Sequence, residues 1–275
     1  MQKRDLFDCL NRGGMACFAL TEPGAGSDAG AVSCRAEKVE GGYILNGTKC
    51  FITNAPIADK ITLFANTREG GGIRGLTVFL VDADTKGISI GKEEDKMGIR
   101  ASATAEIIFE DCFVPDSARV GKEGRGFMIA MQTLQMSRPV VAAISVGIAQ
   151  AAIEAAVAYS HHRKQFGVKI ATFEMVQQMI ADMVMKTEAA RILTYKACVA
   201  QMNKDKKAGL YSAMSKCFAS DTAMEVTTTA VQVMGGNGYS RENPVEKYMR
   251  DAKIMQIYEG TNQVQRLVIA NETTF

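Results

Sequence analysis

The spacing of hydrophobic residues changes period near the middle of this chain, and this change constrains the fold more than any other sequence feature. Up to about residue 120, short strand-like runs are separated by turn residues, and some alternate apolar and polar side chains, as in Thr104–Phe109. From about Gly124 onward, apolar residues and alanines recur at helical spacing. A period of two is typical of strands, and a period near 3.6 is typical of helices. The sequence therefore predicts a β domain followed by an α domain.

The first half is predicted to form a sheet from several short strands. The strand-like runs are Ala31–Val39, Tyr43–Leu45, Lys49–Thr53, Ile61–Thr67, Leu76–Asp82 and Ala105–Asp111. Gly41-Gly42 and Asn46-Gly47 lie between runs, and an Asn-Gly pair favours a tight hairpin. No long helical pattern interrupts the runs, which favours an antiparallel sheet or barrel over βαβ units.

The second half contains three long helical patterns. The first covers Phe127–Ser160, and the second begins after Thr172, which can cap it, and continues past Ala190. The third covers Ala208–Met234 and ends at the glycine run that begins with Gly235. Helices of this length can pack side by side.

Two shorter helical segments complete the pattern. Pro244 can open a helix that ends near Tyr258, and Thr261 or Asn262 can cap a last helix through Ala270. Three long helices and a short pair predict an antiparallel four-helix bundle.

The predicted fold class is therefore α+β, with an antiparallel β-barrel or sheet followed by a helical bundle. We expect the β domain to cover residues 1–122 and the helical domain residues 123–275. A length of 275 residues is enough for two domains, and 47% hydrophobic residues supply a core for each.

Charge and cysteine content argue against several classes of protein. The 32 Lys and Arg residues nearly balance the 30 Asp and Glu residues, which gives no reason to expect nucleic acid or a membrane surface as a partner. Two histidines argue against a His-built metal site, and seven cysteines without a CxxC pair indicate free thiols in a reducing compartment.

The most apolar stretch, Pro139–Tyr159, contains Ser145, Gln150 and Glu154, which favours a buried helix over a membrane span. With no secretory signal visible, we expect a cytoplasmic or mitochondrial-matrix protein.

One glycine-containing segment of the first half can bind a ligand. In Thr21-Glu-Pro-Gly-Ala-Gly-Ser-Asp28, Gly24 and Gly26 let the backbone turn and approach a ligand closely, while Thr21 and Ser27 offer hydroxyl donors. The alternative is an ordinary loop rich in turn-forming residues. The segment is not a P-loop, because no Gly-Lys-Ser/Thr follows, and not a dinucleotide fingerprint, because no helix follows.

Two segments of the second half also have both a structural and a functional interpretation. The glycines of Gln232-Val-Met-Gly-Gly-Asn-Gly-Tyr239 can simply end a helix, or they can let the backbone approach a flat or charged ligand. In Tyr258-Glu-Gly-Thr-Asn-Gln263, Glu259 lies on a loop between two short helices. Its carboxylate can be solvated, or it can point into a cleft and act in catalysis.

Six motifs follow one another in a fixed order along the chain: Cys17-Phe-Ala-Leu-Thr-Glu-Pro-Gly-Ala-Gly-Ser-Asp28, Leu45-Asn-Gly-Thr-Lys-Cys-Phe-Ile-Thr-Asn54, Lys96-Met-Gly-Ile-Arg100, Arg163-Lys-Gln-Phe-Gly167, Gln232-Val-Met-Gly-Gly-Asn-Gly238 and Met249-Arg-Asp-Ala-Lys-Ile-Met-Gln-Ile-Tyr-Glu-Gly-Thr-Asn-Gln263. In this order, and over about residues 14 to 270, the sequence resembles the acyl-CoA dehydrogenase family of flavoproteins. Each motif alone is modest, but together they are highly specific.

The resemblance implies oxidation of a short- or medium-chain acyl-CoA to the 2-enoyl-CoA, with FAD as acceptor and electron-transferring flavoprotein as the next electron carrier. Glu259 matches the family's base, which removes the α-proton. In the family, the backbone N–H at the Glu259 position and a flavin hydroxyl stabilise the developing oxyanion. A desolvating thioester pocket is expected to raise the pKa of this base toward neutrality.

The resemblance also assigns binding residues. Those matched to FAD contacts are Phe18, Leu20, Thr21, Gly26, Ser27, Phe51, Ile52, Thr53, Arg163, Phe166, Phe173, Gln232, Gly235, Gly236, Thr261 and Gln263. Those matched to positions near the CoA or the thioester are Ser27, Gln135, Arg138, Gly260 and Arg266. In the family, the positions of Arg163, Phe166, Gln232 and Gly236 contact the FAD of a neighbouring subunit, which implies a homo-oligomer, either a dimer or a tetramer.

The sequence departs from the family at its front. Family members begin with a helical domain ahead of the Thr-Glu-Pro-Gly segment, where this sequence has about fifteen residues. The alternatives are therefore a fragment, or a non-catalytic or partner-completed subunit that binds flavin or acyl-CoA. An acyl-CoA oxidase and an enoyl-CoA reductase are closer variants that no residue excludes.

Overall fold

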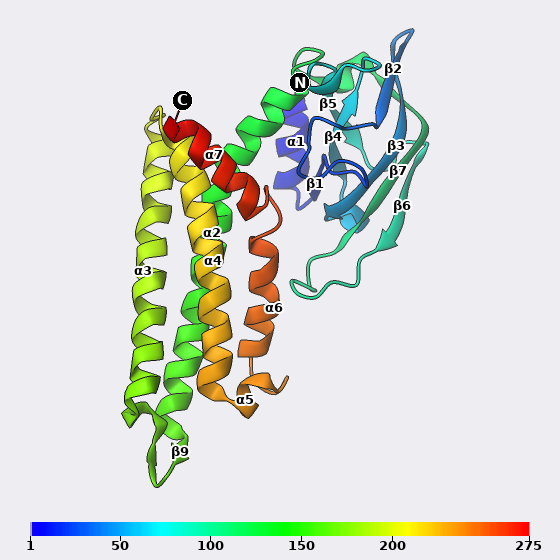
Figure 1. Cartoon of the computed structure of the whole chain (residues 1–275). Coiled ribbons are helices and arrows are strands. Elements are labelled where there is room, and N and C mark those ends of the chain that lie inside the picture. Colours follow the sequence, from blue (N-terminus) through cyan, green and yellow to red (C-terminus); the bar gives the residue numbers. More distant parts are fainter. Residues whose placement is uncertain (1, 275) are drawn as a thin grey trace. The chain divides into compact units, whose positions relative to one another are not determined.

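The computed structural model describes residues 2–274, which form two compact units (Figure 1). The sheet unit contains the described residues up to Lys96 together with Arg100–Gln132. The helical unit contains Met97–Ile99 and the described residues from Thr133 onward. The expected domain boundary between residues 122 and 123 stays a prediction.

The sheet unit contains eight strands in one sheet and a helix at the start of the described chain. Along the sheet the strand order is β6-β7-β3-β2-β4-β5-β8, and β1 pairs with β4. The elements are α1 (Gln2–Asn11), β1 (Ala16–Ala19), β2 (Arg35–Val39), β3 (Gly42–Thr53), η1 (Ala55–Ile57), β4 (Lys60–Asn66), η2 (Gly72–Arg74), β5 (Leu76–Asp82), β6 (Ile88–Glu93), β7 (Thr104–Pro115), η3 (Asp116–Ala118) and β8 (Arg119–Val120).

The pairing within the sheet is mainly antiparallel, as the sequence predicts. Only β1 and β2 pair with β4 in parallel, β2 through the single pair Arg35 and Asn66. Tyr43, Phe64 and Phe79 are fully buried in the core of this unit, and the rings of Tyr43 and Phe79 meet edge to face. The sheet thus supplies a rigid support for its loops.

The prediction of a hairpin at Asn46-Gly47 is wrong. Strand β3 continues through this pair, with a register shift against β7 between Leu45 and Gly47. The Asn46 side chain accepts a hydrogen bond from the N–H of Asp111 on β7, at 2.8 Å. A Cβ atom on Gly47 would lie 2.8 Å from the Cα atom of Cys34, so glycine serves close backbone approach here. The hairpin lies between β2 and β3 instead.

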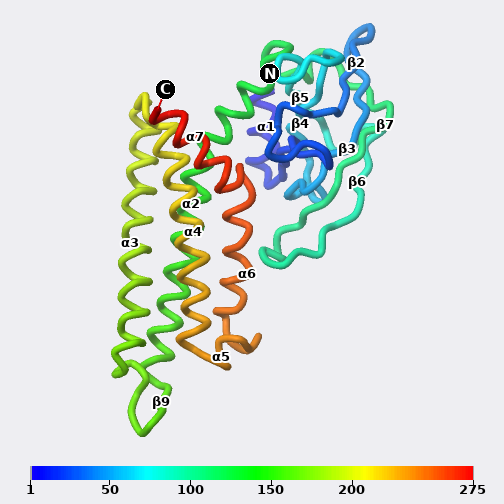
Figure 2. Tube along the Cα trace, in the orientation of Figure 1, coloured from blue at the N-terminus to red at the C-terminus, as the bar shows by residue number. Residues whose placement is uncertain are grey.

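The helical unit contains α2 from Thr133 onward, five further helices and a two-stranded hairpin. The elements are α2 (Gly126–His162), β9 (Lys164–Gln165), β10 (Val168–Lys169), η4 (Ile170–Thr172), α3 (Glu174–Met202), α4 (Ala208–Met234), α5 (Gly236–Tyr239), α6 (Val245–Met255) and α7 (Asn262–Thr274). In Figures 1 and 2, α2, α3, α4 and α6 run side by side, which confirms the predicted bundle. Helix α4 packs against α3, α6 and α7.

Small residues fill the core of the bundle. Ala149, Ala152 and Ala156 on α2 lie in one buried cluster with Ala223 and Ala230 on α4. Helix α2 is long and apolar enough to cross a membrane by length and composition alone. Its most apolar window is 44% buried in the structure.

Some helix ends differ from the predictions. The Thr172 hydroxyl donates to the Lys169 carbonyl, 2.7 Å away, so it does not cap α3. Helix α6 ends at Met255 rather than near Tyr258, because Gln256 to Thr261 form a loop. The Thr261 hydroxyl accepts from the N–H of Val264, at 3.3 Å, so Thr261 caps α7 as predicted.

Overpacking the buried cluster of the bundle is expected to destabilise the helical unit. Ala152 is fully buried, and Ala152→Leu inserts three heavy atoms into a close-packed site, which typically costs about 1–3 kcal/mol. Urea unfolding followed by circular dichroism measures the loss. Ala158→Leu makes the same change at an exposed position of the same helix and should leave the midpoint nearly unchanged. Equal midpoints for the two variants would contradict the packing described.

Candidate active site

The glycine-containing loop of the sheet unit is closed by its own backbone. The N–H of Glu22 donates to the carbonyl of Ala25, and the N–H of Ala25 donates to the carbonyl of Glu22, both at 3.1 Å. The carbonyl of Thr21 accepts from the N–H of Cys50 on β3, at 3.0 Å. A Cβ atom at Gly24 or Gly26 would meet nothing within 4 Å, so the backbone faces open space there.

A buried ion pair holds this loop from inside. The Glu22 carboxylate accepts from Lys49 Nζ at 2.7 Å, from the Ser33 hydroxyl at 2.6 Å and from the N–H groups of Ser33 and Cys34 at 2.7 and 2.9 Å. Lys49 Nζ also donates to the carbonyl of Leu20, at 3.0 Å. Both charged side chains are almost completely buried. Burial acts to raise the pKa of Glu22, but the Lys49 ammonium and the donors of Ser33 hold it below its usual value.

An irregularity in β3 places the second predicted flavin segment next to this loop. The register against β7 shifts between Lys49 and Ile52, and Phe51 there adopts a left-handed conformation with φ of 55°. As a result the Phe51 side chain is 65% exposed, while Ile52 is buried. Thr53 is exposed at the end of the strand.

The structure therefore brings together the residues that the sequence assigns to the flavin in this unit. Phe18, at the start of the segment, is half-buried and its ring lies 4.8 Å from that of Phe64. The two segments are joined through the hydrogen bond between Thr21 and Cys50. The residues concerned are Phe18, Leu20, Thr21, Gly26, Ser27, Phe51, Ile52 and Thr53.

In the helical unit, Glu259 lies on the loop between α6 and α7. Glu259 is left-handed, with φ of 59°, and Gly260 follows with φ of 88°. A left-handed conformation is uncommon for a residue other than glycine, and it persists only where the surroundings hold it. Glu259 Oε2 accepts from the Ser137 hydroxyl on α2, at 2.5 Å, so the carboxylate is held against that helix.

Arg138 and Pro139 follow Ser137 inside α2. Arg138 is 7% exposed, and its Nε has no hydrogen-bond partner within residues 2–274. Burial lowers the pKa of the Arg138 guanidinium, and the Glu259 carboxylate opposes this. Pro139 lacks the N–H that the Gln135 carbonyl would otherwise accept, and the Gln201 side chain donates to that carbonyl at 3.1 Å. Two predicted substrate residues, Arg138 and Gly260, therefore lie beside or on the Glu259 loop, while the Gln135 side chain lies near Gly209 at the start of α4.

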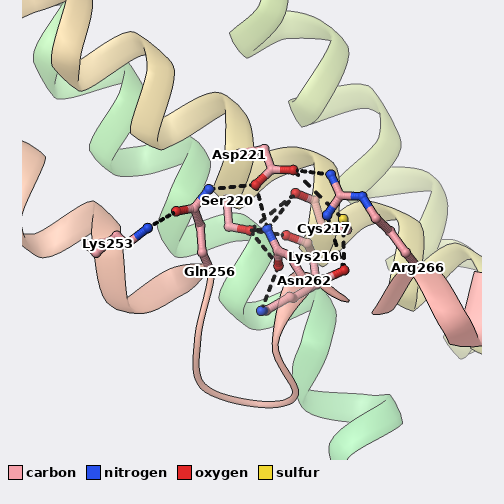
Figure 3. A network of polar contacts seen from close by, with 8 residues as sticks. All are labelled: Lys216, Cys217, Ser220, Asp221, Lys253, Gln256, Asn262 and Arg266. Atoms are coloured by element: carbon pink, nitrogen blue, oxygen red, sulfur yellow. Dashed lines mark hydrogen bonds and ion pairs between the residues drawn. The ribbon is translucent and has the colours of Figure 1, made fainter. Parts of the chain in front are cut away.

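Asp221 on α4 is the centre of the polar network shown in Figure 3. Its carboxylate accepts from Gln256 at 2.6 Å, from Asn262 at 2.7 Å and from Arg266 at 2.6 Å. Burial acts to raise the pKa of Asp221, but these donors, with Arg266 the strongest, hold it below its usual value. The network ties both ends of the Glu259 loop to α4. Arg266, a predicted substrate residue, is bound to Asp221 here.

Of the remaining predicted cofactor residues, Thr261 and Gln263 lie at the Glu259 loop and the start of α7, and the other six lie at the opposite end of α6. Phe166, in the turn of the β9–β10 hairpin, is 96% exposed, and its ring lies 6.1 Å from that of Phe173. Asn237 on α5 donates to the Tyr159 hydroxyl near the end of α2, at 2.5 Å, which joins the hairpin end of α2 to the glycine run. Helix α6 has 11 residues and is therefore about 16 Å long. One group is thus separated from the Glu259 loop: Arg163, Phe166, Phe173, Gln232, Gly235 and Gly236.

Sequence reasoning missed the polar residues that hold the loops. Ser137, Lys216 and Asp221 lie in helical runs whose spacing indicates only a packed helix. A lysine or an aspartate inside such an apolar run is the signal that could have found them, because buried charges are rare unless paired. Within the described chain, no group of three or more His, Cys, Asp or Glu residues could hold a metal ion.

Two family models match this chain. The model described as "Acyl-CoA dehydrogenase, middle domain" matches residues 17–112, and the model described as "Acyl-CoA dehydrogenase, C-terminal domain" matches residues 124–273. Together they match most of both units.

Curated relatives and solved structures agree with these matches. The chain is 50% identical over 270 residues to the probable acyl-CoA dehydrogenase FadE25 of Mycobacterium tuberculosis, which covers 98% of this chain and 69% of that protein. It is 47% identical over 256 residues to the mitochondrial short-chain specific acyl-CoA dehydrogenase of Mus musculus, which covers 93% of this chain and 62% of that protein.

Among solved structures, butyryl-CoA dehydrogenase from Megasphaera elsdenii matches with a TM-score of 0.94 and 47% identity, over 96% of this chain and 69% of that one. A chain in a structure of the electron transferring flavoprotein of Acidaminococcus fermentans matches with a TM-score of 0.92 and 51% identity, over 94% of this chain and 68% of that one.

Removing the buried carboxylate of the sheet unit is expected to destabilise it in a pH-dependent way. Glu22→Gln leaves the Lys49 ammonium buried without its counter-charge, which should cost about 3 kcal/mol at pH 7. The folded-state pKa of Glu22 is lowered, so its contribution is fully present above the usual glutamate pKa of about 4.3 and is lost as the pH falls through the lower folded value. Urea unfolding at pH 7 and below pH 4 tests both points. Asp116→Asn removes an exposed partner of Lys38 and serves as the control, and an effect no larger than its own would count against the pair.

Proposed function

Because this chain belongs to the acyl-CoA dehydrogenase family, whose members are flavoprotein oxidoreductases, we propose that it oxidises a short- or medium-chain acyl-CoA to the 2-enoyl-CoA with Glu259 as the base. One observation carries the proposal: the Glu259 carboxylate is held on a left-handed loop by Ser137, next to the buried Arg138. The butyryl-CoA and short-chain relatives support the choice of chain length.

The residues of both units fit FAD. Phe51 and Phe166 offer exposed aromatic faces, 65% and 96% accessible, on which a flat ring could lie. At Gly26, Gly235 and Gly236 a Cβ atom would meet nothing within 4 Å, so the backbone can approach a phosphate there. When bound, FAD would supply the two-electron acceptor for the reaction. We therefore propose the whole predicted set as FAD-binding residues, with Thr261 and Gln263 near the loop.

The Glu259 loop offers both a base for a proton and hydrogen-bond donors for a developing negative charge. Ser137 donates to Glu259 Oε2, which leaves Oε1 available to take the α-proton of a thioester. Among the hydrogen bonds of the described residues, the N–H groups of Glu259, Gly260 and Thr261 have no acceptor. Preorganised N–H groups stabilise an oxyanion without reorganising during the reaction. The loop therefore combines a base with donors for the developing enolate oxygen.

The groups around the loop suit an anionic substrate. Arg138 is buried with its Nε unpaired, and Gln135 lies one turn away on α2. Arg266 on α7 and Ser27 in the sheet-unit loop are exposed and can contact the CoA moiety. We propose these residues, with Gly260, as the acyl-CoA-binding set.

We further propose that the chain forms a homo-oligomer and that its electrons pass to electron-transferring flavoprotein. The separation of Arg163, Phe166, Gln232 and Gly236 from the Glu259 loop by the length of α6 supports a role toward the FAD of a second copy. The match to a chain in the Acidaminococcus fermentans structure supports the acceptor. Seven free cysteines, six of them buried, support a reducing location such as the cytoplasm or the mitochondrial matrix.

Replacing the base should abolish turnover and leave the cofactor bound. Glu259→Gln keeps the shape of the side chain but cannot accept the α-proton, so kcat should fall by about 10³-fold or more. Flavin content is measured by its visible spectrum, and turnover by bleaching with butyryl-CoA. Glu154→Gln, at an exposed position of α2, is the matched control. A Glu259→Gln rate above about a tenth of wild type, a loss under about 1.4 kcal/mol, would show that another group is the base.

The hairpin arginine should affect cofactor retention rather than the chemical step. Arg163→Ala removes an exposed guanidinium, and with it the proposed contact to the negatively charged FAD of a neighbouring copy. We expect a lower flavin-to-protein ratio after gel filtration. Lys164→Ala, the next residue of the same hairpin, should retain FAD as wild type does. Equal flavin content in Arg163→Ala and wild type would argue against the contact.

A further inference from the structure

Lys216 lies inside the bundle on α4 and contacts the loop that carries Glu259. Its side chain has no solvent exposure. Its Nζ donates to the carbonyl of Gly260 at 2.8 Å and to Oδ1 of Asn262 at 2.9 Å (Figure 3 shows the bond to Asn262). Both acceptors belong to the loop or to the first residue of α7. Both of these hydrogen bonds of the Lys216 ammonium therefore go to the loop or to the residue that follows it.

We propose that Lys216 is a positioning residue that fixes the conformation of the Glu259 loop for proton abstraction. This inference rests on the proposed function, in which Glu259 is the base. Lys216 itself does not touch the reacting carbon; it acts through the backbone of Gly260.

The electrostatics of Lys216 differ from those of an ordinary structural lysine. Within the described chain, no carboxylate lies within ion-pair distance of its Nζ, and the two acceptors are neutral oxygens. The pKa of Lys216 is lowered to about 8, mainly by burial; the Arg138 guanidinium acts in the same direction, and the negative charges of Cys217, Asp221 and Glu259 oppose it. A buried cation without a counter-ion is favourable only where its hydrogen bonds are kept. The loop conformation that presents these oxygens is thus the one that keeps the ammonium solvated by protein.

Gln265 holds the same loop from α7. Its Nε2 donates to the carbonyl of Glu259 at 3.2 Å and to the carbonyl of Gly260 at 3.0 Å. Gln265 is also fully buried. Two buried side chains from different helices therefore share the Gly260 carbonyl, which restricts rotation of that peptide plane.

The geometry of the trans peptide connects these contacts to the site. In a trans peptide, the C=O and the following N–H point in opposite directions. Drawing the carbonyls of Glu259 and Gly260 toward Lys216 and Gln265 therefore turns the N–H groups of Gly260 and Thr261 the other way. Those N–H groups have no acceptor among the described residues, so they stay available at the loop surface. Lys216 thus stabilises both the left-handed Glu259 and the donor groups beside it.

The kinetic test separates positioning from binding. Lys216→Met keeps the length of the side chain but removes the charge and the donors. We expect the rate constant of flavin reduction by butyryl-CoA to fall about 30-fold, which equals about 2 kcal/mol. The dissociation constant of butyryl-CoA and the flavin content should change less than about threefold, because the binding residues remain. Lys196→Met, at an exposed position on α3, is the matched control and should behave as wild type.

A second measurement does not depend on turnover. Hydrogen–deuterium exchange of peptides spanning residues 256–265 reports the loop directly, through the protected N–H groups of Asn262 and Gln265. We expect Lys216→Met to exchange about tenfold faster in this segment, with peptides of α3 unchanged. If the wild-type protein carries FAD but is not reduced by any acyl-CoA, the proposed function fails while the exchange result still decides the role of Lys216.

Two outcomes would overturn the positioning role. One is wild-type exchange in residues 256–265 of Lys216→Met. The other is a uniform loss of protection across α3 and α4, with a reduction rate that is normal per folded molecule, because this would make Lys216 a purely structural residue. Should Lys216→Met fail to fold, Gln265→Met removes the other side chain that donates to the Gly260 carbonyl. A wild-type reduction rate in that variant would equally refute the proposal that these bonds position the Glu259 loop.

Discussion

In each unit a lysine ammonium lies wholly inside the protein and donates to a backbone carbonyl of a loop that carries proposed site residues. Lys49 donates to Leu20 and Glu22 in the sheet unit, and Lys216 donates to Gly260 in the helical unit. A buried ammonium is costly unless its hydrogen bonds are satisfied, so a loop that moves away from it loses more than one contact. The hydrogen bonds of these buried charges therefore hold the loops in addition to the loops' own backbone hydrogen bonds.

The backbone is strained on β3 close to Lys49 and within the Glu259 loop. Phe51 and Glu259 are left-handed although neither is glycine, a conformation that costs of order 1 kcal/mol or more. In both cases the strain directs a side chain that regular structure would place elsewhere. Phe51 interrupts the alternation of β3 and is exposed, and Glu259 is directed to Ser137. Strain of this kind is expected where function, and not stability, selects the conformation.

Packing within the helical bundle fixes the part of α2 that contacts the Glu259 loop. Alanines of α2 and α4 lie in one buried cluster, and Pro139 leaves the Gln135 carbonyl without its helical donor, so the Gln201 side chain on α3 donates a hydrogen bond to it. The stretch Ser137 to Pro139 is thereby fixed where Ser137 can reach Glu259. The helix that appears in the sequence as a plain apolar run thus also positions the carboxylate.

The sequence by itself determined the two-part fold, the family and the helix from Ala208 to Met234, because hydrophobic period and a glycine stop are local properties of the chain. The predicted hairpin at Asn46-Gly47 is wrong, because Gly47 is needed for close approach to the backbone of Cys34, which lies elsewhere in the chain. The contacts that hold Glu259, by contrast, form between residues far apart in the sequence. Ser137 lies 122 residues from Glu259 and Lys216 lies 44 residues from Gly260, and a local pattern carries no information on which distant groups will meet. Those pairings follow from helix packing, which brings a buried charge and its acceptors together only in the folded chain.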